Sequence, residues 1–257
     1  MLLAVDIGNT SINLGIYENG KLVSASKLLT DRETDSDTYA DAIKELFTSL
    51  GIESPGFETA VISSVVPEIT DRFSSALSAF IKTIPLIVGE KYNGNLKVDI
   101  LPVSHLGADL IAASIGAIKK YPLPCLVADL GTATKILVID KNGVFRGCTI
   151  SPGVKISLDA LSEKTSLLPE IILEKPEHAI GENTVECMQS GIVFGTAAML
   201  DGLIRRISTE LGEENITLIA TGGYSETISQ CCEHEMIYDE HLLLDGLAEI
   251  YETSRIN

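Results

Sequence analysis

The chain has 257 residues, of which 45% are hydrophobic and 21% are charged. These proportions are typical of a folded globular protein and exclude a disordered or fibrous chain. The formal net charge of −17 argues against binding to nucleic acid, because contact with a phosphate backbone needs a basic surface.

We expect a cytoplasmic protein that does not associate with a membrane. The apolar stretch Met1–Val5 ends at Asp6 and is too short for a signal peptide. No window approaches the ~18 uninterrupted apolar residues of a membrane-spanning helix. The five cysteines include no Cys-x-x-Cys pair, which favours free thiols in a reducing compartment. The run Cys231–His234 suggests either packing or a metal site, and packing is favoured because adjacent cysteines seldom bind one tetrahedral metal.

In chain order, the first elements are three strands that form two hairpins. The apolar run from Leu3 is typical of a buried strand, and a glycine turn leads from its end to the second strand. Asn19-Gly20 is expected to supply the two positive-φ residues of a tight hairpin before the third strand. Helices are predicted at Asp35–Leu50 and Pro67–Lys82, on either side of a strand at Thr59–Val65.

The same pattern returns in the second half of the chain. Residues Leu3–Gly20 align without a gap on Leu126–Gly143, at a constant offset of 123 residues. The residues that recur include Asp6, Gly8, Leu14, Ile16, Asn19 and Gly20, which return as Asp129, Gly131, Leu137, Ile139, Asn142 and Gly143. Helices are predicted near 157–164, 184–211, 225–232 and 241–253, with a strand at 216–220. Hairpins followed by helix–strand alternation indicate a mixed sheet covered by helices, so we expect two related halves, 1–120 and 121–257, with a cleft between them.

Each copy of the repeat places a glycine turn directly after an Asp at the end of a strand. Such a turn lets successive backbone N–H groups point at one oxyanion. The candidate phosphate-binding residues are Gly8, Asn9, Thr10, Gly131 and Thr132. Asp6 and Asp129 are candidates to hold the accompanying cation, since hard cations prefer carboxylate oxygen. The alternative is a plain hairpin with capped ends, and two copies in equivalent places argue against it.

A third glycine turn, Thr221-Gly222-Gly223-Tyr224, follows the strand predicted at 216–220. Gly222 and Gly223 are candidates to bind a nucleoside or its α-phosphate at a helix N-terminus, and an ordinary helix start explains them equally well. The chain has neither a Walker A motif nor the Rossmann Gly-x-Gly-x-x-Gly fingerprint, which disfavours those two nucleotide-binding folds.

Taken in order, the motifs resemble those of the type III pantothenate kinase family over almost the whole chain. The matching segments are Asp6–Thr10, Ser63–Pro67, Gly107–Asp109, Asp129–Ala133, Ile150–Gly153, Thr165–Pro169, Gly181–Thr184, Ser190–Gly195, Thr221–Tyr224 and Leu244–Leu247. The resemblance implies an α/β fold of two tandem RNase H-like halves, as in actin-like ATPases, each a mixed sheet flanked by helices. It also implies a homodimer that phosphorylates pantothenate with ATP, the first step of coenzyme A synthesis. Such an enzyme needs a divalent cation such as Mg²⁺ and a monovalent cation, K⁺ or NH₄⁺.

The resemblance assigns roles to individual positions. Asp109 matches the catalytic aspartate that takes the proton from the pantothenate hydroxyl, and Gly107 of the same motif is a candidate to bind pantothenate. Without the resemblance, Asp109 is better explained as the N-cap of a helix that follows. Asp129 matches the residue that binds the monovalent cation beside the phosphates. Thr184 matches a residue that reaches pantothenate across the dimer interface, and it is also a candidate N-cap.

The chain departs from the family's pattern on the substrate side. The family's Gly-x-Asp-Arg ends in Leu110 here, so the arginine that would contact the pantothenate carboxylate is missing. The family's Tyr-x-Asn-Pro stretch is replaced by Ile100–Pro102, a threonine by Lys135 and an aspartate by Leu137. Lys135 either adds positive charge near the phosphates, replaces a bound cation, or is a salt-bridged strand residue, whereas Leu137 is expected to pack.

Two functions remain open at this point. An active pantothenate kinase with a reshaped acceptor pocket is favoured, because Asp6, Asp109, Asp129 and both glycine turns are retained. The alternative is a catalytically impaired paralogue that binds nucleotide or acts in regulation, which the replaced arginine, threonine and aspartate suggest.

Overall fold

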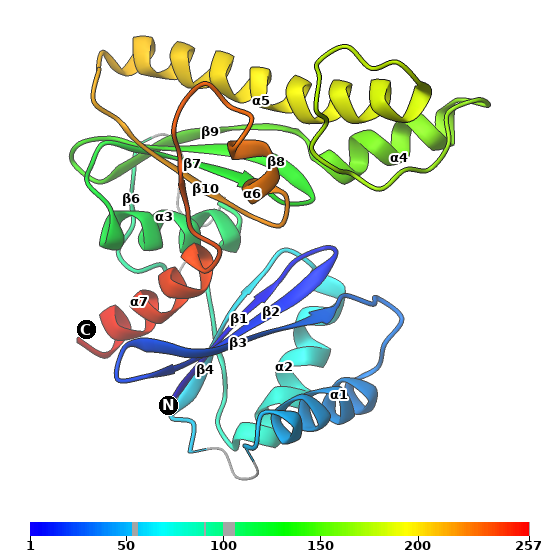
Figure 1. Cartoon of the computed structure of the whole chain (residues 1–257). Helices are drawn as coiled ribbons and strands as arrows, with labels where there is room; N and C mark the ends of the chain where they lie inside the picture. Colours follow the sequence, from blue (N-terminus) through cyan, green and yellow to red (C-terminus); the bar gives the residue numbers. More distant parts are fainter. Residues whose placement is uncertain (53–55, 90, 100–105, 257) are drawn as a thin grey trace. The chain divides into compact units, whose positions relative to one another are not determined.

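The computed structural model describes residues 1–52, 56–89, 91–99 and 106–256, and it divides into two units (Figure 1). Unit 1 comprises Met1–Lys119 together with Leu242–Asn257, and unit 2 comprises Lys120–His241. The departure at Ile100–Pro102 lies outside the described residues.

Unit 1 is built on a mixed sheet with the strand order β3-β2-β1-β4-β5. Strands β1, β2 and β3 are joined antiparallel, and β1, β4 and β5 run parallel to one another. The strands are β1 (Leu2–Ile7), β2 (Ser11–Glu18), β3 (Lys21–Leu29), β4 (Thr59–Ser64) and β5 (Leu86–Ile87). The helices are α1 (Ser36–Ser49), α2 (Pro67–Ile81), α3 (Ala108–Lys120) and α7 (Leu242–Ile256), and a short strand, β6 (Lys97–Val98), also belongs to this part of the chain.

Side chains along β1 point alternately to the two faces of the sheet, and different helices cover these two faces. Leu3, Val5 and Ile7 are fully buried and belong to one core cluster with residues of α1 and α2. Because successive side chains of a strand point to opposite faces, Ala4 and Asp6 face the other side of the sheet. Helix α7 packs against β1, β2 and β4, opposite α1 and α2.

The position of α7 differs from the sequence prediction, which assigned residues 242–257 to the C-terminal half. The structure groups this helix with unit 1. Tyr17 Oη on β2 donates a hydrogen bond to Asp245 Oδ1 at 2.6 Å. Gly246 of α7 also lies against the backbone of α3, where an added Cβ atom would be 3.0 Å from Gly116 N. The C-terminal helix is therefore part of the first unit, although it is last in the sequence.

Unit 2 repeats the topology of unit 1, which confirms the predicted repeat. Its own strands are ordered β11-β10-β7-β8-β9, with antiparallel β7–β8–β9 and with β10 and β11 parallel to β7. The strands are β7 (Cys125–Leu130), β8 (Ala133–Ile139), β9 (Val144–Pro152), β10 (Thr217–Thr221) and β11 (Ile237–Tyr238). The helices are α4 (Val154–Lys164), α5 (Thr184–Leu211) and α6 (Ser225–Ser229).

The glycine turn is one residue shorter in unit 2 than in unit 1. In unit 1, Ile7 pairs with Ile12, so the turn consists of residues 8–11. In unit 2, Leu130 pairs with Thr134, so the turn consists of residues 131–133. The ungapped alignment of the two copies therefore does not hold beyond the turn.

The shorter turn changes the partner of each residue on β8 by one position. Asp6 lies opposite Asn13 on β2, whereas Asp129 lies opposite Lys135 on β8. The predicted matches of Leu14 to Leu137 and of Ile16 to Ile139 are wrong by one position for the same reason.

The second hairpin of each copy compensates for this difference. Asn19 and Gly20 have φ values of 51° and 73° and form the predicted two-residue hairpin. In unit 2 the loop covers residues 140–143, and only Gly143 has a positive φ, of 70°. Asp140 Oδ1 closes this longer loop by accepting hydrogen bonds from Asn142 N and Val144 N at 2.8 and 3.0 Å.

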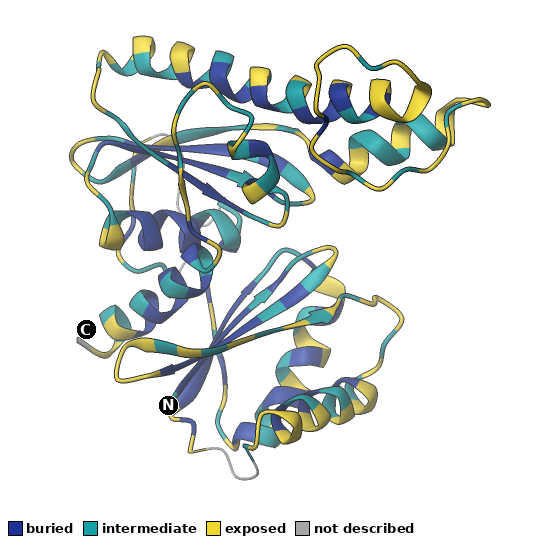
Figure 2. Ribbon diagram, in the orientation of Figure 1, coloured by how far each residue is buried: buried dark blue, intermediate teal, exposed yellow. Residues whose placement is uncertain are grey.

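Helix α5 is long and apolar enough, by length and composition alone, to cross a membrane. In its most apolar window 44% of the residues are buried, and Figure 2 shows buried and exposed positions alternating along it. Ile192, Val193, Leu200 and Ile204 belong to the core cluster of unit 2. Core packing therefore accounts for the apolar side of this helix.

Candidate functional site

The first glycine turn of unit 1 is held closed by the residue that follows β3. Gly8 N donates to Ser11 O at 2.9 Å. Thr30 Oγ1 donates to Gly8 O at 2.7 Å, and Thr30 N donates to Thr10 O at 3.2 Å. Asn9 and Thr10 are exposed at the tip. The structure therefore brings Gly8, Asn9 and Thr10 together in one closed turn.

A cation that sequence reasoning missed lies at this turn. Arg32 Nη2 donates to Asn9 Oδ1 at 2.8 Å, and the Arg32 side chain is 55% exposed. A guanidinium can bind phosphate oxygen through several N–H groups. Arg32 has no motif of its own, and only the pairing of β2 with β3 brings it to the turn.

The carboxylates at the two strand ends have equivalent surroundings. Asp6 on β1 lies beside Ser63 on the parallel strand β4, and Asp129 on β7 lies beside Thr221 on the parallel strand β10. Ser63 is fully buried, and its Oγ has no hydrogen-bond partner among the described residues. Each candidate cation ligand therefore has a hydroxyl residue next to it.

In unit 2 two glycine turns converge on Asp129. A Cβ atom on Gly131 would lie 3.3 Å from Asp129 Oδ1, and one on Gly222 would lie 2.9 Å from the same oxygen. Gly222 also has a φ of +94°, and its Cβ would lie 2.8 Å from Leu130 O, so a side chain is excluded on both counts. Thr132 and Gly223 follow in the same two turns.

The turn of Gly131 and Thr132 rests on Gly153, which follows β9. A Cβ atom on Gly153 would lie 2.6 Å from Gly131 O and closer still to Thr132 O. Sequence reasoning found Gly153 in a matching segment but gave it no role. The close approach explains why a glycine is needed at position 153, where any side chain would collide with the backbone of the turn.

The third turn does not open a long helix. α6 contains five residues, shorter than the predicted 225–232, and its N-cap Tyr224 makes no side-chain capping bond. A helix dipole needs several aligned peptides. The role expected of Gly222 and Gly223 therefore rests on the backbone of the turn.

Asp129 forms an ion pair with Lys135. Lys135 Nζ lies 2.8 Å from Asp129 Oδ2, and both side chains are 14% exposed. Sequence analysis left three roles open for Lys135, and the structure shows it as a salt-bridged strand residue. The ion pair also places a positive charge near the turn of Gly131. Leu137 is fully buried on β8, which confirms that it packs.

Gly107 and Asp109 lie at the N-terminal end of α3 in unit 1. The helix begins at Ala108, so Asp109 lies in its first turn and is not the N-cap. Asp109 Oδ1 accepts a hydrogen bond from Leu110 N at 2.8 Å. A Cβ atom on Gly107 would lie 2.5 Å from the same oxygen. Gly107 thus leaves room for the half-buried Asp109 carboxylate.

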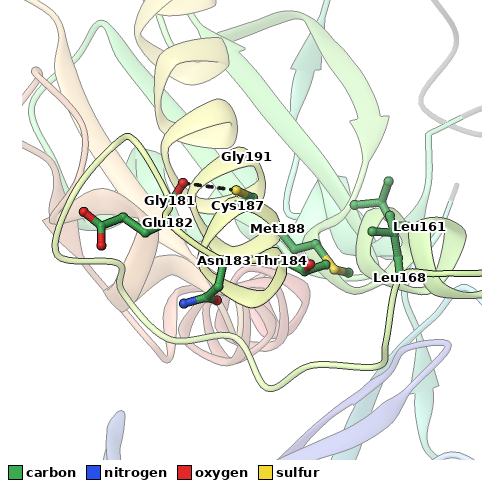
Figure 3. Close-up of a pocket in the computed structure, with 9 residues that line it drawn as sticks. All are labelled: Leu161, Leu168, Gly181, Glu182, Asn183, Thr184, Cys187, Met188 and Gly191. Carbon is green, nitrogen blue, oxygen red and sulfur yellow. Dashed lines mark hydrogen bonds between the residues drawn. The ribbon is translucent and has the colours of Figure 1, made fainter.

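Thr184 lines an open pocket of about 600 Å³ in unit 2 (Figure 3). The lining residues are Leu161, Leu168, Gly181, Glu182, Asn183, Thr184, Cys187, Met188 and Gly191. The predicted N-cap role of Thr184 is wrong: the N-cap of α5 is Asn183, whose Oδ1 accepts from Glu186 N at 3.1 Å. Glu186 Oε2 accepts in return from Glu182 N at 2.9 Å. Thr184 is exposed as the first residue of the helix.

The Cys231–His234 run is packed and hydrogen-bonded. Within the described part of the chain, no three His, Cys, Asp or Glu side chains are grouped to hold a metal ion. Cys231 and Cys232 pack against the core cluster of unit 2. His234 Nδ1 lies 2.7 Å from Asp201 Oδ1, and the backbone N–H groups of Glu233 and His234 also donate to Asp201. The packing interpretation is confirmed.

Replacing Asp201 with alanine is expected to lower the free energy of unfolding by about 2–4 kcal/mol at pH 7. Burial opposes ionisation of this carboxyl, but the hydrogen bonds from Glu233 and His234 outweigh it and lower the pKa. The stabilisation by ionised Asp201 is therefore complete at pH values above the pKa of the unfolded state, about 3.9. It is lost as the pH falls through the lower pKa of the folded state. Urea unfolding of wild type and of Asp201→Ala at several pH values measures the difference in their free energies of unfolding.

The matched control is Asp159→Ala, which removes an ion pair whose side chains are 61% and 44% exposed. It should change the free energy of unfolding by less than about 1 kcal/mol. Equal effects of the two substitutions would contradict the role given to Asp201.

The topology of the two sheets defines the class of protein. The chain superposes on the activator of the 2-hydroxyisocaproyl-CoA dehydratase from Clostridium difficile, with bound ADPNP, with a TM-score of 0.58 and 14% identity. The match covers 99% of this chain and 94% of that one. The fold is that of the actin-like ATPases and sugar kinases, as the sequence predicts.

The sequence comparisons are more specific. A family model for type III pantothenate kinase matches residues 2–206. The type III pantothenate kinase of Dehalococcoides mccartyi is 38% identical over 254 residues, covering 99% of this chain and 98% of the relative. That of Exiguobacterium sibiricum is 38% identical over 255 residues, covering 99% and 100%. The chain belongs to the type III pantothenate kinase family.

Proposed function

We propose that the chain phosphorylates pantothenate to 4′-phosphopantothenate with ATP, the first step of coenzyme A biosynthesis. The observation that carries the proposal is the convergence of the Gly131 and Gly222 turns on Asp129 in a chain of this family. Backbone N–H groups of such turns suit phosphate oxygen. The residues proposed to bind ATP are Asp6, Gly8, Asn9, Thr10, Gly131, Thr132, Gly222 and Gly223.

Asp6 is the proposed ligand of Mg²⁺. Mg²⁺ commonly takes only one or two carboxylates from a protein and its other ligands from phosphate and water. The residues on the strands beside Asp6 are Asn13 and Ser63, and both carry oxygen atoms that suit a hard cation or its water. When bound, Mg²⁺ neutralises charge that develops on the transferred phosphoryl group.

Asp109 is the proposed general base. An alcohol attacks a phosphoryl group poorly unless it is aligned and its proton is accepted. The carboxylate stands in the first turn of α3, where its Oδ1 is fixed by Leu110 N. Asp109 would accept the hydroxyl proton of pantothenate while the hydroxyl oxygen bonds to the γ-phosphorus and ADP leaves.

Gly107 and Thr184 are proposed to bind pantothenate. The family's arginine is replaced by Leu110, and leucine cannot pair with the pantothenate carboxylate. The loss of one charge-assisted hydrogen bond costs about 1.5–3 kcal/mol, or about ten- to a hundredfold in affinity. We therefore expect a raised KM for pantothenate.

We further propose a cytoplasmic homodimer. The exposed large hydrophobic side chains include Ile150, Ile156, Leu167, Ile172, Ile180 and Val185, which gather in the sequence around α4 and the start of α5. Exposed apolar surface of this kind is typical of protein interfaces. The five cysteines, all of them described in the structure, form no disulfide, which suits a reducing compartment. Sedimentation velocity that gave only a monomer would contradict the homodimer.

The alternative is a catalytically impaired paralogue that binds nucleotide or acts in regulation. Leu110 and the Asp129–Lys135 pair favour it, since both change the family's pattern. A coupled assay of ADP release with ATP, Mg²⁺ and K⁺ separates the two. Release that depends on pantothenate supports the kinase. No release, together with protection of the protein by ATP against thermal unfolding, supports the paralogue.

A further inference from the structure

The monovalent cation implied by the family resemblance does not fit the residues around Asp129. Asp129 Oδ1 faces the glycine turns, and Oδ2 is 2.8 Å from Lys135 Nζ. A K⁺ ion bound to this carboxylate would stand close to an ammonium of the same charge. With both side chains 14% exposed, water would screen that repulsion only weakly.

We propose that the ammonium of Lys135 is the resident cation of the nucleotide site in unit 2, so that nucleotide binding needs neither K⁺ nor NH₄⁺. The inference rests on the proposed function. A lysine ammonium is a compact single positive charge, and Asp129 fixes this one at the turn that would hold phosphate. Its positive charge offsets the negative charge of the Asp129 carboxylate, which repels a polyphosphate.

The register of unit 2 explains how the lysine reaches this place. Because the turn of residues 131–133 is one residue shorter than the turn of residues 8–11, position 135 lies directly opposite Asp129. The equivalent position in unit 1 is the uncharged Asn13 opposite Asp6. A lysine therefore lies opposite the strand-end aspartate in unit 2, whereas an uncharged asparagine lies there in unit 1.

A purely structural role explains the position of the pair less well. Backbone pairing already joins β7 to β8 along its whole length, and partly buried ion pairs contribute little net stability over apolar residues. The next two residues of β8, Ile136 and Leu137, are fully buried and apolar. The charged pair stands where the glycine turns meet, which is where an anion would need it.

The test measures the Kd of Mg·ADP by titration calorimetry in KCl and in choline chloride of equal ionic strength. Wild type should bind equally in both salts, within about twofold. Lys135→Thr, which leaves space and a hydroxyl oxygen, should bind at least about tenfold more weakly in choline chloride and recover in KCl. Lys135→Met, which fills the space without a charge, should bind weakly in both salts.

Two outcomes would overturn the inference. One is wild-type affinity that rises more than about fivefold with K⁺, a result that needs no variant to fold. The other is a folded Lys135→Thr protein that binds as wild type in choline chloride. ADP release with pantothenate, assayed in both salts, tests the function separately. Salt-independent nucleotide binding without release would refute only the proposed kinase, whereas release that depends on K⁺ would refute only the role of Lys135.

Discussion

Replacing Asp109 with asparagine is expected to lower kcat for the phosphorylation of pantothenate by about 10²–10⁴-fold, the usual contribution of a general base. Asparagine keeps the shape of the side chain and an oxygen that can accept from Leu110 N. It cannot take the proton of the pantothenate hydroxyl. Initial rates of pantothenate-dependent ADP release, measured at saturating ATP, give the ratio directly.

Binding and stability should change little in the same variant. We expect the affinity for Mg·ADP to stay within about threefold of wild type, because no nucleotide contact is proposed for Asp109. Asp41→Asn, at an exposed position on α1, is the matched control and should leave kcat unchanged. Turnover of Asp109→Asn at the wild-type rate would remove Asp109 from the mechanism.

The fold was predictable because the repeat is local in sequence. Each copy carries its own strand, glycine turn and hairpin signals, and these identify the strands without knowledge of any distant contact. The register of β7 with β8 was not predictable. The shorter turn at 131–133 and the longer loop at 140–143 offset each other in length, so the two copies align without a gap although the residues between these two places are shifted. The grouping of α7 with unit 1 was missed as well, since it depends on packing against β1, β2 and β4.

The candidate site was predictable where a motif carries its own geometry. The turns at Gly8, Gly131 and Gly222 are such cases. Contacts that depend on tertiary structure could not be predicted from the sequence. Arg32 reaches Asn9 only through the pairing of β2 with β3, and the pairing of Lys135 with Asp129 depends on a register that the alignment hides.

Replacing Gly246 with alanine is expected to lower the free energy of unfolding by about 3 kcal/mol or more, or to prevent folding. The added Cβ atom would lie 2.7 Å from the carbonyl carbon of Ala112 and overlap its oxygen, and would lie 3.0 Å from Gly116 N. All of these are backbone atoms, so α3 and α7 must move apart. Intrinsic helix propensity acts in the opposite direction, since alanine is favoured over glycine by about 1 kcal/mol. The steric cost of the added Cβ atom should exceed the gain in helix propensity. Backbone atoms, unlike the end of a side chain, cannot change rotamer to relieve the overlap.

Gly202→Ala on α5 separates the two effects. No heavy atom lies within 4 Å of the Cβ position there, so only helix propensity acts, and we expect a gain of up to about 1 kcal/mol. Urea unfolding of the two variants beside wild type should therefore give changes of opposite sign. If Gly246→Ala were as stable as Gly202→Ala, the close crossing of α3 and α7 would be refuted, and with it the reason why a glycine is needed in the Leu244–Leu247 segment.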